Sequence, residues 1–213
     1  MIEGIERLAP MEIERRSFEI INQELAEQGI CLPEDQREIT IRAIHASADF
    51  DYARNMYYSP GAVAIARDLL RQGTSIVTDT NMARAGISKK SLEALGGRLC
   101  CFMADADVAA RAAALGITRA AVSMDKAARL PGPVFFAVGN APTALVRLRE
   151  LMDEGTFAPA FIVAAPVGFV NVVRSKELIM ESGVPCIVCR GRKGGSTVAA
   201  AIVNALLYGI KRV

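Results

Sequence analysis

Three side chains that can perform acid–base chemistry lie close together, because the only histidine of the chain stands between a cation and a carboxylate. Arg42, His45 and Asp49 are spaced i, i+3 and i+7, so a continuous helix would present them on one face. Ile41 and Ile44 fall on the other face and can anchor the helix to a core. We expect Asp49 to hydrogen-bond the imidazole and favour its protonated form, a proton donor near neutral pH. The plainer alternative is a surface salt bridge beside a bystander histidine.

A second candidate site follows the last predicted strand, where three basic residues precede the glycines that open the C-terminal helix. This segment runs from Arg190 to Ser196. Free N–H groups at a helix start, with flexible cations beside them, form a receptor for carboxylate or phosphate. We therefore expect Gly194, Gly195 and Ser196 to contact an anion, although a glycine-rich entry needed only for close packing has the same sequence. The segment is not a P-loop, and no strand leads into a dinucleotide-binding motif.

Two other polar segments are weaker candidates. In the turn 139–143, Asn140 and Thr143 could face a ligand, or they could simply cap the following helix. Near the N-terminus, Arg15 and Ser17 are not neighbours on a regular helix surface, so a joint site would need a helix edge or a partner. An ordinary charged helix face explains this second pair equally well.

The remaining reactive residues are predicted to be structural. Cys186 and Cys189 form a CxxC pattern, but three-residue spacing on a strand points the two thiols to opposite sides, so they cannot share a metal. All five cysteines are interpreted as structural. The pair Lys176–Glu177 is predicted to be a solvated helix face.

The first part of the chain, residues 1–73, is predicted to be helical. Apolar periodicity indicates helices over 11–28 and 35–48. Ser59, followed by proline, predicts the N-cap of a third helix that ends near Gly73. The histidine then lies near the end of the second helix.

The second part, residues 74–213, alternates five apolar β-rich runs with helical ones. The runs are Ser75–Thr78, Leu99–Phe102, Val134–Val138, Phe161–Ala164 and Cys186–Cys189. Their starts are 24, 35, 27 and 25 residues apart, enough for a crossover helix each time. Because the runs are apolar throughout, both faces of the sheet should be buried. We predict a single domain, residues 1–213, with three α/β/α layers, a doubly wound, mainly parallel five-stranded sheet and a helical N-terminal extension. Ligands of such folds lie at the carboxyl ends of the strands.

Charge and hydropathy exclude several classes of partner. The net charge is +2 and the basic residues form no stripe, so we expect no nucleic acid. The longest uncharged run, 155–173, is interrupted by proline and glycine, so we expect no membrane helix. The acidic N-terminus differs from a signal peptide, and the expected location is the cytoplasm.

Several short segments, in this order and spacing, form a specific pattern. They are Glu14–Phe18, Ile44–Ala46, Asp79–Met82, Ala85–Ile87, Gly139–Leu145, Pro166–Val170, Ser175–Glu177, Gly191–Ser196 and Asn204–Leu206. Together they resemble the precorrin-8X methylmutase family of corrin (vitamin B12) biosynthesis, including its cobalt-precorrin-8 branch. The resemblance covers nearly the whole chain.

The resemblance implies an isomerase that moves a methyl group from C-11 to C-12 of the corrin precursor, giving hydrogenobyrinate or cobyrinate, without a cofactor. It also implies a flavodoxin-like fold and a homodimer with active sites near the interface. His45 matches the family's proton donor and acceptor, and Ser17 and Arg42 match substrate-contacting positions. The residues predicted to bind the tetrapyrrole are Ser17, Arg42, Arg15, Asp49, Asn140, Thr143, Gly194, Gly195 and Ser196.

Two other functions stay open. A carrier that holds a corrinoid without converting it would have a similar site, although carboxylate capture alone needs no imidazole. A phosphate-binding or signalling module of flavodoxin-like shape is the second, but Asp79, Asp105 and Asp107 lack the expected placement. No set of histidine, cysteine and carboxylate residues has metal-ligand spacing, so any cobalt would arrive within the macrocycle.

Overall fold

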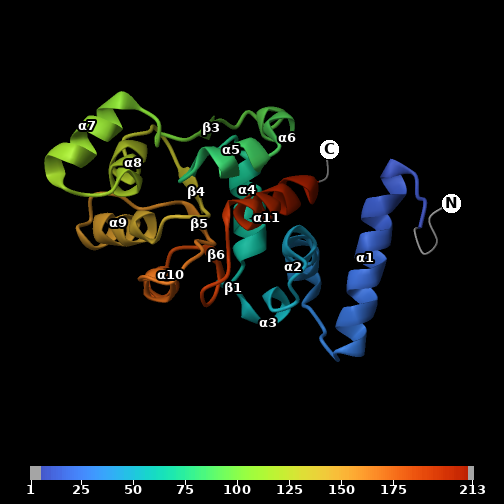
Figure 1. Cartoon of the computed structure of the whole chain (residues 1–213). Helices are drawn as coiled ribbons and strands as arrows, with labels where there is room; N and C mark the ends of the chain where they lie inside the picture. The colour runs from blue at the N-terminus through green and yellow to red at the C-terminus, as the bar shows by residue number, and fades with distance from the viewer. Residues whose placement is uncertain (1–5, 211–213) are drawn as a thin grey trace.

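The computed structural model describes residues 6–210, which form a six-stranded sheet between helices (Figure 1). The strands are β1 (Met56–Tyr58), β2 (Ser75–Thr78), β3 (Leu99–Cys100), β4 (Val134–Val138), β5 (Phe161–Ala164) and β6 (Cys186–Cys189). Their order across the sheet is β1-β6-β5-β4-β2-β3. Strands β2 to β6 are parallel, and β1 runs antiparallel to β6. The five parallel strands follow the order 2-1-3-4-5, which is that of flavodoxin-like sheets.

Helices cover both faces of this sheet. They are α1 (Pro10–Glu27), α2 (Glu34–Ser47), α3 (Tyr52–Asn55), α4 (Ala62–Arg71), α5 (Asn81–Gly86), α6 (Lys89–Glu93), α7 (Ala106–Leu115), α8 (Arg119–Ala127), α9 (Pro142–Asp153), α10 (Val172–Met180) and α11 (Ser196–Tyr208). Along β4, Phe135 packs into a core with α2, α4 and α11, whereas Phe136 packs into a second core with α8, α9 and α10. Figure 1 shows these two groups on opposite sides of the sheet. Burial on both faces explains why the strand sequences are uniformly apolar.

The predicted strands are confirmed, with one shortened and one strand missed. Four runs have the predicted bounds, and the run that begins at Leu99 ends two residues early, at Cys100. The missed strand is β1, which lies in the part predicted to be helical and pairs Met56 with Cys189. An antiparallel edge strand of three residues needs no crossover helix, so nothing in the spacing indicates it.

The predicted N-cap at Ser59 is wrong. Ser59 extends the β1–β6 pairing: its N–H donates to the Cys186 carbonyl at 3.0 Å, and its hydroxyl accepts from the Cys186 N–H at 2.9 Å. Helix α4 begins later, at Ala62, after Gly61 in the left-handed conformation (φ 68°). The hydroxyl is therefore used by the sheet and not by the helix.

Helix α2 ends sooner than the sequence predicts. Its last helical residue is Ser47, and Ala48 adopts the left-handed conformation (φ 52°). Ile39 and Ile44 are fully buried against the core that contains α11. Figure 1 shows α1 beyond α2, as the helix farthest from the sheet. The histidine thus lies in the last turn of a well-anchored helix, between the sheet domain and an outer helix.

The cysteines of the last strand occupy the predicted environment. Cys186 and Cys189 are buried and belong to the cores on opposite faces of the sheet, so their thiols diverge. Cys31 differs from the other four because it is exposed. Within residues 6–210, no helix has the length and apolar character needed to cross a membrane.

Candidate active site

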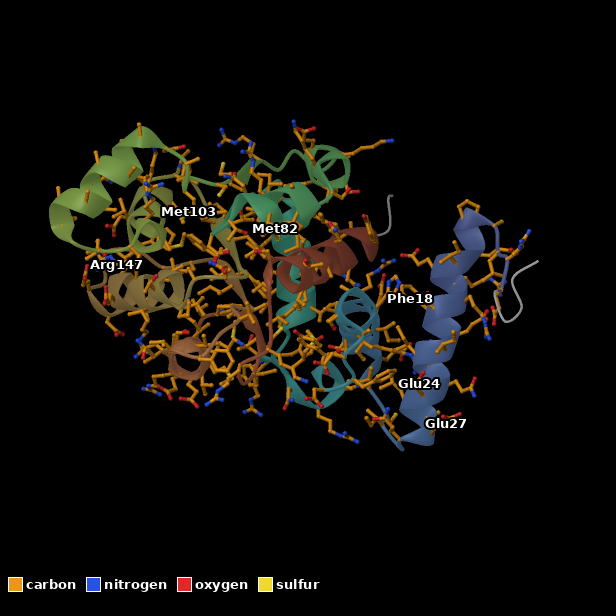
Figure 2. All side chains as sticks on the ribbon, viewed as in Figure 1. Phe18, Glu24, Glu27, Met82, Met103 and Arg147 are labelled. Carbon is orange, nitrogen blue, oxygen red and sulfur yellow. The ribbon has the colours of Figure 1, made fainter. Side chains whose placement is uncertain are left out.

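The single histidine lies where side chains of three helices meet. His45 is exposed, and the ring of Phe18 from α1 meets it edge-on, with ring centroids 5.3 Å apart and an interplanar angle of 87°. One turn earlier, the Arg42 guanidinium lies 5.1 Å from the Phe18 ring centroid and 5.1 Å from that of Tyr208 on α11. Figure 2 labels Phe18 on the side of α1 that faces α2. An exposed imidazole therefore stands beside a cation held between two rings; we call these four residues the histidine cluster.

Arg42 is oriented by its surroundings, but its donors are not all used. Its Nη1 donates to Glu14 Oε1 at 2.9 Å, and its side chain is only 18% exposed. The Nε atom is buried and has no hydrogen-bond partner among residues 6–210. Unpaired buried donors are rare and call for an explanation such as a missing ligand. A guanidinium in this position can meet a carboxylate of a bound anion in a fixed orientation.

The two candidates on α1 have different surroundings. Ser17, next to Phe18, is half-buried and donates its hydroxyl to the Ile13 carbonyl at 2.8 Å, which leaves its oxygen free to accept. Arg15 forms an exposed ion pair with Glu19 at 2.6 Å. No contact within the described residues joins Arg15 to the histidine cluster, so its part in binding stays a prediction.

The predicted contact between Asp49 and the imidazole is absent from the structure. The left-handed Ala48 turns the chain out of the helix, so the i+7 spacing no longer places Asp49 beside His45. The Asp49 carboxylate instead accepts from Lys193 Nζ at 2.6 Å and from the Asp51 N–H at 3.0 Å. The Lys193 ammonium holds the pKa of Asp49 below its usual value. Asp49 is thus paired with the loop after β6.

The turn that leads into α9 is bound by a carboxylate from much earlier in the chain, 60 to 62 positions before its partners. Asp79 is fully buried and accepts the N–H groups of Gly139 at 2.8 Å, Asn140 at 2.8 Å and Ala141 at 2.6 Å. Burial raises the pKa of Asp79, and these three donors oppose that rise. The sequence places Asp79 at the end of β2. It does not indicate that β4 is the neighbouring strand, so the hydrogen bonds from Asp79 to the loop after β4 could not be predicted.

Neither residue proposed as the α9 cap has that role. The N-cap position is Ala141, and Thr143 accepts a hydrogen bond from the Thr118 hydroxyl at 2.8 Å. The Asn140 side chain is exposed and makes no hydrogen bond within the described residues. Helix capping therefore does not account for an asparagine at position 140.

The glycine segment before α11 is tightly packed. A Cβ on Gly194 would overlap the Ala165 carbonyl, and the Gly195 N–H donates to that same oxygen at 2.8 Å. The buried Ser196 hydroxyl forms a hydrogen bond of 2.7 Å with the Thr80 hydroxyl. Close packing thus accounts for Gly194, and a ligand contact by any of the three stays a prediction.

The three cations that precede these glycines already have partners. Lys193 pairs with Asp49 and Asp51, each at 2.6 Å. The Arg192 guanidinium lies 5.4 Å from the Phe169 ring centroid, and Arg190 contacts Tyr57 in the same manner at 5.6 Å. The two arginines keep their charge available to a carboxylate, because a stacked guanidinium can still donate hydrogen bonds.

The prediction that Lys176 lies on a solvated helix face is wrong. It is only 1% exposed, and its Nζ donates to the Gly191 and Lys193 carbonyls, both at 2.8 Å. Burial lowers the pKa of Lys176 to about 8. Its position, four residues after Val172 and three before Ile179, places it on the buried face of α10, and that apolar spacing was the available signal.

The loop between β5 and α10 exposes apolar side chains. Phe169 is 81% exposed and Val170 is 78% exposed, which is unusual for side chains of this size in a folded protein. In the described part of the chain, no three histidine, cysteine or acidic side chains gather into a metal site.

Comparison with known proteins gives consistent matches over nearly the whole chain. Residues 12–209 match the model of the family described as precorrin-8X methylmutase. A cobalt-precorrin-8 methylmutase of Priestia megaterium is 41% identical, with 92% of this chain and 87% of the relative covered. A precorrin-8X methylmutase of Pseudomonas aeruginosa is 42% identical, with 91% and 93% covered. A solved precorrin-8x methyl mutase structure from Thermus thermophilus is 36% identical, has a TM-score of 0.82 and covers 92% of this chain and 96% of its own.

Proposed function

Because the chain belongs to the precorrin-8X methylmutase family, we propose that His45 is the residue that protonates its tetrapyrrole substrate. The chain is an isomerase, an intramolecular transferase that catalyses the methyl shift of vitamin B12 biosynthesis. In the proposed reaction the methyl group moves from C-11 to C-12 of the macrocycle by a [1,5]-sigmatropic shift. The product is hydrogenobyrinate or, when cobalt is already bound, cobyrinate.

The histidine cluster supports this role for His45. A [1,5] shift transfers no electrons to or from the substrate, so it requires no redox cofactor. Protonation of the conjugated macrocycle lowers the barrier, and general acid catalysis of this kind contributes about 10²- to 10⁴-fold in rate. His45 is the only histidine of the chain, is exposed, and makes no hydrogen bond to residues 6–210 that would occupy its ring nitrogens. That availability is the observation on which the proposal rests.

Arg42 and Ser17 are proposed to hold the macrocycle beside the imidazole. The corrin precursor carries several acetate and propionate carboxylates, which suit the Arg42 guanidinium. Phe18 and Tyr208 offer aromatic surface next to that charge. The further predicted contacts are made by Arg15, Asn140, Thr143, Asp49 and the segment Gly194–Ser196.

We also propose that the protein forms a homodimer in the cytoplasm. Ile13 and Ile20, seven residues apart on α1, are both exposed, and so are Phe169 and Val170. A second copy of the chain would cover such apolar surface. The five unpaired cysteines are typical of a reducing compartment. Light scattering of the purified protein at several concentrations tests the dimer, and a monomer at all of them would exclude it.

The decisive experiment incubates the purified protein separately with precorrin-8X and with cobalt-precorrin-8. A changed visible spectrum at unchanged product mass is the expected result. The chain is 41% identical to a cobalt-precorrin-8 relative and 42% identical to a precorrin-8X relative, so sequence identity does not distinguish the two substrates. The ratio of the conversion rates of the two substrates decides between them. Tight binding without spectral change would favour the carrier. Absence of both binding and conversion would overturn the proposed function.

A further inference from the structure

Among residues 6–210, Lys176 is the only fully buried lysine, and the proposed reaction does not use it. Its Nζ makes two hydrogen bonds of 2.8 Å, both to main-chain carbonyls of the loop after β6, at Gly191 and Lys193. Within the described residues it forms no ion pair with a carboxylate. The nearby Cys189 supplies no counter-charge at neutral pH, because burial raises the pKa of its thiol to about 12. Lys176 is therefore a buried cation that is neutralised only by carbonyl dipoles.

A buried cation of this kind is costly, and an apolar side chain would fill the space at lower cost. What an apolar side chain cannot do is draw two carbonyl oxygens inward. Between those two carbonyls, the Arg192 carbonyl accepts the Gly168 N–H at 3.1 Å, and the loop begins with Gly191 in the left-handed conformation (φ 75°). Three consecutive carbonyl groups of this loop are thus held by hydrogen bonds. Their orientation determines the direction in which the Lys193 side chain leaves the loop.

Lys193 connects this loop to the end of the helix that carries His45. Its Nζ lies 2.6 Å from the Asp49 carboxylate and 2.6 Å from that of Asp51. These two residues follow the last turn of α2, and the same turn contains the histidine. The chain of contacts runs from the buried ammonium through the loop carbonyls to Lys193, and from there to the segment after the helix.

We infer that Lys176 is a positioning residue: it holds the loop 191–193 so that Lys193 clamps the end of α2 and keeps His45 directed at the substrate. This inference rests on the proposed function of His45. Lys176 itself touches no substrate. Its effect should appear mainly in the rate of the chemical step. Ser17 lies on α1, and Arg42 lies one turn before His45 on α2, farther from the end that Lys193 holds.

The first test replaces Lys176 by methionine, which preserves length and removes both hydrogen bonds. We expect kcat for the methyl shift to fall about tenfold or more, because a misplacement near 1 Å can cost up to about 100-fold. The substrate Kd, measured by absorbance titration, should change by a smaller factor than kcat. Amide hydrogen exchange should accelerate at residues 48–51 and 191–195. Lys90→Met is the matched control, because Lys90 is exposed on α6 and forms no ion pair in the described residues; its kcat should equal that of the wild type.

The second test asks whether Lys176 acts through Lys193. Lys193→Met alone should reproduce most of the loss in kcat, and the double variant should lose little more than Lys176→Met does. Additive losses, or a folded Lys176→Met enzyme with wild-type kcat, would overturn the inference. If Lys176→Met does not fold, full kcat in the surface variant Lys193→Met would overturn it as well. An inactive wild-type enzyme would instead overturn the proposed function, and this inference with it.

Discussion

The carboxyl edge of the sheet and the histidine cluster use charge in opposite ways. At the sheet edge, Asp79 and Lys176 are buried and satisfied by main-chain groups: three N–H donors for the acid and two carbonyls for the base. In the histidine cluster, Arg42 is held by side chains, and His45 is exposed and makes no hydrogen bond within the part of the chain that the structure describes. The sheet edge is a rigid frame with its charges already used, whereas the cluster keeps its charge available.

With His45 as the proposed acid, this difference separates the residues that would react from the residues that hold them in place. A main-chain partner cannot move without moving the fold, so charges satisfied in that way stabilise loop geometry. Side-chain partners such as Phe18 and Glu14 can readjust when a ligand arrives. Substitutions in the cluster should therefore change catalysis or binding, and substitutions in the frame should change stability and positioning.

The largest effect is expected from His45→Ala. Removing the acid should lower kcat by about 10²- to 10⁴-fold, because no other described side chain in the cluster can donate a proton near neutral pH. The substrate Kd and the thermal midpoint should stay near those of the wild type, since the side chain is exposed. Rates come from the visible spectral change, and Kd from absorbance titration. Near-normal turnover would remove the imidazole from the mechanism.

The pH dependence of stability distinguishes the frame from the cluster. Burial lowers the pKa of Lys176 to about 8 from an ordinary 10.5, so above pH 8 the unfolded chain binds more protons than the folded one and stability rises with pH. A difference of that size corresponds to roughly 3 kcal/mol at most. In urea titrations between pH 7.5 and 10.5, the wild type should gain stability relative to Lys176→Met. A constant difference between the two proteins would show that the ammonium is not destabilised by burial.

Arg42→Lys should weaken substrate binding, although it keeps the positive charge. A charge-assisted hydrogen bond contributes about 1.5–3 kcal/mol, so we expect Kd to rise about tenfold or more. Lysine keeps the charge but loses the planar group that stacks on Phe18 and Tyr208. Titration with substrate measures the change, and Arg84→Lys on α5 is a control at an exposed arginine. Unchanged Kd would place the carboxylates elsewhere.

The smallest effect is expected from Asp49→Asn. Its carboxylate pairs with Lys193, and Asp51 stays on the same ammonium, so the loss in stability should be about 0.2–1 kcal/mol. The pH profile of kcat should be unchanged, because no hydrogen bond joins Asp49 to the imidazole in the structure. A shifted profile would restore the interpretation drawn from sequence spacing, in which Asp49 orients His45.

Sequence periodicity predicted the parallel strands because buried parallel strands are continuous apolar runs separated by crossover helices. It failed where a single residue changed the path of the chain or where a partner was remote. Nothing in its type indicates that Ala48 adopts a left-handed conformation, and that turn removes Asp49 from the helix face. Likewise, Asp79 binds the turn before a helix that begins 63 residues later, at Pro142, across two neighbouring strands. His45, Arg42 and Ser17 were predicted from residue type and family resemblance, whereas the contacts of Phe18 and Tyr208 with them required the structure.

The short strand β1 has a consequence for how the protein is made. Met56 pairs with Cys189, which is 133 positions later (189 minus 56), and α2 packs on α11, which is later still. Contacts between such distant segments form slowly and late, because a long loop must close before they are made. During synthesis, therefore, the histidine-bearing helix cannot make its contacts with α11 until residues 196–208 have left the ribosome. The helices synthesised first are thus among the last to complete their packing.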